Sequence, residues 1–187
     1  MATMLMVGGL LLSACTYLET APKRPFTTME LLISLSEMPP GWTVSDPPKE
    51  LRDDISTEDA SITIFQADTD FPRRGATHRV YQYRNRSSAK AVYEEFVLPT
   101  QLGNTPAEWA YQSTVSDQSY FACYDYEGRE PLHCQWSARY EEYIVAFSSW
   151  LIPGRMSLQD MERVVRAIDA RMAQYLDKPY EDVSVRP

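Results

Sequence analysis

The sequence has few of the residues from which catalytic and metal sites are usually built. It contains only two histidines and three cysteines among 187 residues. It carries no G-x-S-x-G, Walker loop, H-E-x-x-H or C-x-x-C motif. His133 adjoins Cys134, but neighbouring residues of a strand point to opposite faces, so these two cannot easily share a metal. We therefore expect no metal, no cofactor and no catalytic residue that the sequence identifies.

Positive charge is also scarce. Lys and Arg number 18 against 26 Asp and Glu, which gives a net charge of −8. Binding to nucleic acid requires a basic footprint, so we exclude a nucleic-acid partner. Anionic lipid headgroups would repel such a chain, and attachment to a membrane would need something other than a basic patch. Aromatic residues, by contrast, make up 12% of the chain, which predicts a folded core.

No hydrophobic run is long enough to span a membrane. The longest, residues 4–14, is much shorter than the roughly 20 residues that a spanning helix needs. Gly8 and Gly9 in its middle also disfavour a buried helix. A short apolar run that ends in small residues is typical of a secretory leader, and we expect 1–14 to be a signal peptide.

The end of this run is more specific. Leu12-Ser13-Ala14-Cys15 resembles the lipobox of bacterial lipoproteins, in which the leader is cut before a cysteine whose thiol carries a diacylglyceryl group. The resemblance implies a lipid anchor of the palmitate type on Cys15, an attachment to the lipid bilayer, and a place in the cell envelope facing the extracytoplasmic space. The lipobox pattern normally follows a Lys or Arg, which is missing here. The alternative is a coincidental apolar N-terminus with a buried cysteine.

The rest of the chain is expected to form a lipid-anchored tether over 15–26, a single α+β domain over 27–178 and a flexible tail over 179–187. The proline and charge content of the tether leaves it little to pack. A Thr27-to-Glu30 capping box predicts a helix whose apolar face includes Leu31, Leu32 and Leu35. Short strands are expected from Trp42, over 61–67 and over 77–84, with an acidic connection over 45–60.

Two further helices are predicted. Ser87 and Ser88 should cap one through about Leu98, with Ala91, Val92 and Phe96 facing inward. The second, a long C-terminal helix, begins at Ser157 and ends before Pro179, and its apolar residues recur at helical spacing: Leu158, Met161, Val164, Val165, Ile168, Met172 and Leu176.

The segment 110–151 predicts two hairpin turns. A turn at Gly128-Arg129 pairs residues whose numbers sum to 257, and a turn at Glu141-Glu142 pairs residues whose numbers sum to 283. Alternation then gathers eight residues on one core face: Phe121, Cys123, Cys134, Trp136, Ala138, Tyr140, Val145 and Phe147. Cys123 falls opposite Cys134, within disulfide range. With Cys15 acylated, this pair accounts for the remaining cysteines.

These elements predict an α+β fold: an antiparallel sheet that ends in a three-stranded meander, packed against two or three helices including the long C-terminal one. The order of elements loosely resembles the PsbP/Mog1-like sandwich or the sensor-like domains of some actinobacterial lipoproteins. The resemblance depends on no motif, so it assigns no functional residue.

The other face of the predicted meander carries aromatic rings with polar tips, which suit binding of a peptide or glycan. The candidate ligand-binding residues are Tyr120, Tyr124, His133, Gln135, Arg139 and Trp150, with Tyr126 and Ser137 on the same face. Trp109, at the start of the first strand, and Trp150 are either binding anchors or core residues, and for Trp109 packing is the preferred interpretation. We expect a non-catalytic binding or assembly module for an envelope protein or polymer; a plain polar sheet exterior is the simpler interpretation. The functional alternative is an envelope hydrolase that uses carboxylates which the sequence does not identify.

Overall fold

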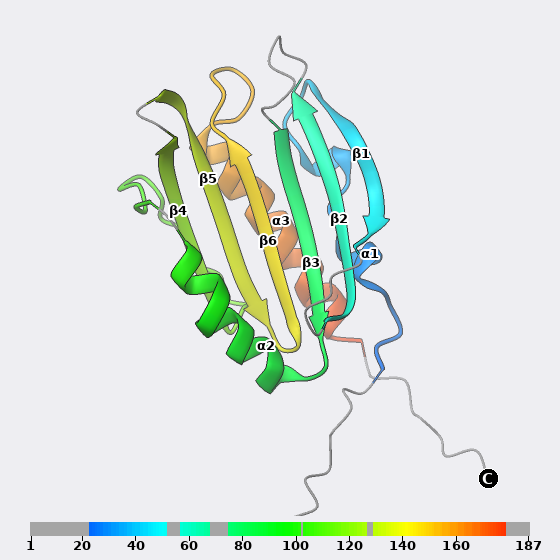
Figure 1. The fold of residues 1–187 in the computed structure, drawn as a ribbon. Coiled ribbons are helices and arrows are strands. Elements are labelled where there is room, and N and C mark those ends of the chain that lie inside the picture. Colours follow the sequence, from blue (N-terminus) through cyan, green and yellow to red (C-terminus); the bar gives the residue numbers. More distant parts are fainter. Residues whose placement is uncertain (1–22, 52–56, 68–74, 102, 127–128, 179–187) are drawn as a thin grey trace, which may run out of the picture.

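The computed structural model describes residues 23–51, 57–67, 75–101, 103–126 and 129–178 (Figure 1). The expected leader, Cys15, all but the last residues of the tether and the expected tail lie outside the described residues. The described chain forms one six-stranded antiparallel sheet in the order β1-β2-β3-β6-β5-β4. The predicted α+β class is confirmed.

The strands are β1 (Trp42–Glu50), β2 (Thr57–Ala67), β3 (Gly75–Tyr83), β4 (Gln118–Tyr126), β5 (Arg129–Tyr140) and β6 (Tyr143–Trp150). The helices are α1 (Thr28–Leu31), α2 (Arg86–Val92) and α3 (Leu158–Leu176), with three short helical turns at Leu35–Glu37, Tyr93–Val97 and Leu98–Thr100. Helix α3 lies behind the sheet and α2 lies across one end of its front face (Figure 1).

The pairings expected between β4, β5 and β6 are found. Cys123 pairs with Cys134, and Trp136 pairs with both Phe121 and Phe147. All eight residues expected on the core face are buried. One detail differs, because a register shift between Tyr124 and Tyr126 pairs Tyr126 with Arg129. These strands are half of one continuous sheet, since β6 also pairs with β3 along its length.

Helix α3 provides the other half of the core. The Ser157 hydroxyl accepts a hydrogen bond from the Asp160 N–H, and the Ser157 N–H donates to the Asp160 carboxylate, so the predicted start is a complete capping box. The predicted apolar stripe is buried from Met161 to Met172, and Leu158 and Leu176 pack against it at the two ends. The long C-terminal helix is confirmed.

The N-terminal helix is much shorter than expected. The capping box forms, with the Thr27 N–H donating to the Glu30 carboxylate at 2.9 Å, but α1 ends after one turn. Leu31, Leu32 and Ile33 are all buried, and one face of a helix cannot bury three consecutive residues. The expected burial of Leu35 is wrong, since it is 40% exposed.

The expected acidic connection over 45–60 is also wrong at both ends. Strand β1 continues to Glu50 and β2 already begins at Thr57. Proline interrupts a strand ladder, but β1 is an edge strand, where the missing N–H is tolerated. Two register shifts, on either side of Asp46, accommodate Pro47 and Pro48.

Helix α2 presents a different face from the one predicted. Its cap is Asn85, whose side chain accepts from the Ser88 N–H at 2.8 Å. Ala89 is its buried residue, and Tyr93, directly after α2, is buried as well. Phe96, expected inside, is 62% exposed. Ala91 is likewise exposed and Val92 half-buried. No helix of the described residues has the length and apolar character needed to cross a membrane.

Candidate functional site

The described residues cover only part of the face of the sheet away from α3, here called the outer face. At one end Tyr93 of the turn after α2 is fully buried, and its hydroxyl donates to the Ser137 carbonyl at 3.0 Å. Ile144 of β6 packs in the same small cluster. The opposite end, where β5 begins and β6 ends, lies away from α2 (Figure 1). Binding residues are therefore expected at that end.

Three predicted residues form a row of rings across β4, β5 and β6, here called the aromatic row. His133 pairs directly with Tyr124 on one side and Trp150 on the other. The ring centroids of Tyr124 and His133 lie 5.1 Å apart, and those of His133 and Trp150 lie 4.9 Å apart. Partial burial lowers the pKa of His133, so its ring is neutral at neutral pH.

The aromatic row borders a hollow of about 200 Å³ on the outer face, here called the outer hollow. Its lining comes from five strands: Ser45, Ile64, Phe65, Gln66, Gly75, Thr77, His133, Ser148 and Trp150. Gln135 pairs with Ser148, and Ser148 pairs with Thr77, so small polar side chains continue beside the aromatic row. Among the residues that the structure describes, the lining includes no Asp, Glu, Lys or Arg.

Strands β1, β2 and β3 supply most of this lining, and sequence reasoning missed their part. The pairing of β3 with β6 is what brings Thr77 and Gly75 beside Ser148 and Trp150. No local pattern predicts which distant strands pair. The one available signal is alternation, which places Thr77 on the face opposite the buried His78.

Tyr120, also predicted for the site, lies elsewhere. It lines a second hollow of about 210 Å³ beside edge strand β4, together with Trp109, Tyr111 and Phe121. Trp109 was expected to begin the first strand of the meander, which is wrong because β4 starts at Gln118. Its ring instead stacks on Phe121, with centroids 3.6 Å apart. Trp109 therefore belongs to the packing around the core.

Arg139 contributes little to the outer hollow. Its guanidinium donates to the Asp117 carboxylate at 2.7 Å, and the Arg139 side chain is only 13% exposed. The Glu141 N–H donates to the same carboxylate at 2.8 Å. The two hydrogen bonds to Asp117 hold the residue before β4 beside the β5–β6 turn. Arg139 therefore stabilises that corner of the sheet.

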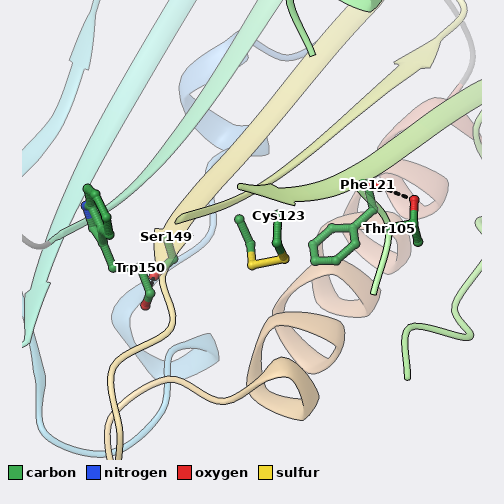
Figure 2. Close-up of a disulfide and its surroundings, with 6 residues drawn as sticks. Thr105, Phe121, Cys123, Ser149 and Trp150 are labelled. Carbon is green, nitrogen blue, oxygen red and sulfur yellow. Dashed lines mark hydrogen bonds between the residues drawn. A yellow bond between two sulfur atoms is a disulfide. The ribbon is translucent and has the colours of Figure 1, made fainter. Parts of the chain in front are cut away.

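The predicted disulfide between Cys123 and Cys134 is present, with the two Cα atoms 4.0 Å apart. Both cysteines are buried on the core face. Trp150 projects to the side away from the disulfide (Figure 2). Next to the disulfide, the Thr105 hydroxyl donates to the Phe121 carbonyl at 2.7 Å (Figure 2). The bond therefore joins β4 to β5 directly beneath the aromatic row.

Among the described residues, the buried carboxylates lie outside both hollows. Asp169 of α3 is 2% exposed and accepts hydrogen bonds from the hydroxyls of Tyr111 and Tyr140. Glu142 is equally buried and pairs with Arg24. Within the described ranges, no group of three or more His, Cys, Asp or Glu residues is placed to hold a metal ion.

His78 is fully buried on the core face, where its Nδ1 accepts from the Ile33 N–H at 3.1 Å. Burial, with the nearby positive charge of Arg171, lowers the pKa of His78 from 6.5 to about 3. A neutral, hydrogen-bonded core histidine of this kind serves packing.

Comparison with protein-family models, with curated proteins and with solved structures gives no match for this chain. The resemblance to the PsbP/Mog1-like sandwich and to actinobacterial sensor-like domains therefore stays a prediction. Function has to be inferred from the side chains of the chain itself.

Proposed function

We propose that the protein is a lipid-anchored component of the cell envelope that binds an envelope protein or polymer without catalysing a reaction. The observation that carries the proposal is the outer hollow, where the half-buried ring of Trp150 stands beside neutral hydroxyl and amide groups. Few convergent polar groups next to an aromatic surface are typical of a binding site. The lipobox-like sequence that ends in Cys15 supports the location.

The way in which the N-terminal segment joins the domain fits this proposal. Arg24 is 4% exposed and donates to Glu142 in the β5–β6 turn at 2.9 Å and to the Leu176 carbonyl at 3.2 Å. The segment 16–23 could extend no more than roughly 29 Å. An anchor on Cys15 would thus hold the β5–β6 turn near the membrane.

The outer hollow lies at the opposite end of the same strands. From Glu141 in that turn, His133 is about 26 Å along the strand, at roughly 3.3 Å per residue. A domain held by its β5–β6 turn would therefore present the aromatic row and the outer hollow away from the bilayer. That is where an extracytoplasmic partner has access.

The hydrolase alternative gains no support from the described residues. The carboxylates buried there, Asp169 and Glu142, are each satisfied by hydrogen-bond donors and line neither hollow. A pair of catalytic carboxylates would have to face each other across a cleft. We therefore place binding before hydrolysis.

Intact-mass spectrometry of the protein isolated from native membranes tests the anchor. We expect an N-terminus at Cys15 that carries acyl groups, and a Cys15→Ser variant that keeps its leader. Recovery of partners from cross-linked membranes tests the binding surface. Trp150→Ala should lower recovery per folded molecule, whereas Phe96→Ala, an exposed ring on the α2 side, should not. Equal recovery with both variants would contradict the proposal.

A further inference from the structure

We infer that the ligand of the outer hollow is a neutral glycan, a sugar ring of which stacks on Trp150. This inference rests on the proposed binding function and names the chemical class of the ligand. It depends on three features of the site: the neutral side chains of the described lining, the arrangement of the aromatic row, and the pairing of the backbone beneath it.

As far as the structure describes it, the lining carries no formal charge. Its polar groups are the hydroxyls of Ser45, Thr77 and Ser148, the Gln66 amide and the His133 ring, whose pKa burial lowers. In a chain with a net charge of −8, a neutral patch of this kind neither attracts a cation nor pairs with an anion. Hydroxyls and amides both donate and accept, so they suit a ligand that consists of hydroxyl groups.

The Trp150 ring gives the site its apolar component. Trp150 is half-buried, and the edge-to-face contact with His133, at an interplanar angle of 68°, fixes the orientation of its ring. An aromatic body beside polar tips matches a ligand with one apolar face and many hydroxyls. A sugar ring has this construction, because its axial C–H bonds form one face while its hydroxyls lie around the rim.

The sheet beneath the hollow argues against a peptide. Peptides commonly bind a sheet by adding a strand, which requires the unpaired backbone of an edge strand. Here the floor belongs to β2, β3, β6 and β5, and each of these strands is paired on both sides. The strands of the floor therefore offer no unpaired backbone edge to which a peptide strand could add.

The shape of the site favours a polymer over a single sugar. The aromatic row runs from Tyr124 of β4 to Trp150 of β6, and the outer hollow continues the line to Ser45 of β1. Six strands spaced by about 4.8 Å give a strip of roughly 24 Å across the sheet. A linear neutral oligosaccharide could lie along this strip, perpendicular to the strands.

Calorimetric titration of the full chain tests the inference. The protein is reconstituted in phosphatidylcholine nanodiscs, so that no sugar-based detergent competes. Chitotetraose and cellotetraose serve as neutral probes, and tetragalacturonate is the anionic probe of similar size. We expect at least one neutral probe to bind and tetragalacturonate not to bind.

Three variants locate the site. Trp150→Ala should weaken binding at least tenfold, Trp150→Phe should keep it within a few-fold because a ring remains, and Phe96→Ala should leave it unchanged. Thermal melting of each variant shows whether it is folded. If Trp150→Ala does not fold, then Gln66→Ala, which removes one amide from the lining, should still weaken binding several-fold.

Two results would overturn the inference. One is the absence of binding by either neutral probe up to about 10 mM, well above the concentration at which weak ligands bind. The other is equal binding by the wild type and the Trp150 variants. If membrane cross-linking still depends on Trp150 in either case, the face binds another ligand and the proposed function stands. If that dependence is lost as well, both fail.

Discussion

The buried ion pair between Arg24 and Glu142 gives the sharpest stability prediction. The two residues are 118 positions apart in the chain, and the Arg24 Nε lies 2.9 Å from the Glu142 carboxylate. Their side chains are only 2% and 3% exposed. The guanidinium also contacts Glu141 and the Leu176 carbonyl, so Arg24 joins the N-terminal segment to the β5–β6 turn and to the end of α3.

Arg24→Ala should lower the free energy of unfolding by about 3–5 kcal/mol, because it leaves the Glu142 carboxylate buried without a counter-charge. Arg86→Ala is the matched control. Arg86 also pairs with the β5–β6 turn, at 2.7 Å from Glu141, but its side chain is 64% exposed. Removing such a surface pair should cost less than about 1 kcal/mol.

Guanidinium denaturation with linear extrapolation measures both variants. A second substitution separates charge from packing: adding Glu142→Gln to Arg24→Ala should recover part of the loss, because the uncompensated charge is gone. The reasoning is refuted if Arg24→Ala costs no more than Arg86→Ala, or if Glu142→Gln makes the Arg24 variant still less stable.

Three further outcomes follow from the packing of the core. The pKa of His78 is lowered from 6.5 to about 3 in the folded protein, so between these pH values the unfolded state binds more protons than the folded state. The free energy of unfolding therefore falls as the pH is lowered through this window, by roughly 1.4 kcal/mol per pH unit. Denaturation of His78→Phe between pH 7 and 4 should remove this component of the slope; parallel curves would contradict it. Trp109→Ala should lower the free energy of unfolding measured by denaturation by roughly 3 kcal/mol, since the Trp109 ring stacks on Phe121. The control Phe96→Ala should change it by less than about 0.5 kcal/mol. Equal losses of stability in the two variants would refute the packing role of Trp109. Reduction of the Cys123–Cys134 bond should lower stability by roughly 3 kcal/mol, and labelling of both thiols in denaturant without reductant would exclude the bond.

The second half of the chain was predictable because its signals are local. Two turns set the pairing of β4, β5 and β6, and alternation then predicted the eight core-face residues correctly, although the buried Tyr143 was left out. The start of α3 followed from the Ser157 capping box. These features need only residues that are close in the sequence.

The first half was less predictable because long-range packing decides it. After α1 the chain leaves the helical conformation, and Leu32 and Ile33 are both buried. The Ile33 N–H then donates a hydrogen bond to Nδ1 of His78. The packing of Tyr93 against Ser137 decides which face of α2 points inward. The apolar residues that flank Tyr93 in the sequence do not predict this packing.

The candidate site shows the same division. The aromatic row of Tyr124, His133 and Trp150 follows from local register, and the sequence predicted it. The remainder of the outer hollow depends on the pairing of β3 with β6, which joins segments about 70 residues apart. Gln66 and Thr77 were therefore missed.

The binding role of the outer face can be measured most directly by site-specific photo-crosslinking in intact cells. One crosslinking residue replaces Gln135, beside the outer hollow, and a matched one replaces Gln159, an exposed position on α3 behind the sheet. The account predicts crosslinked products from position 135, lost on Trp150→Ala, and none from position 159. Crosslinks from position 159 alone, or equal yields from both positions, would contradict it.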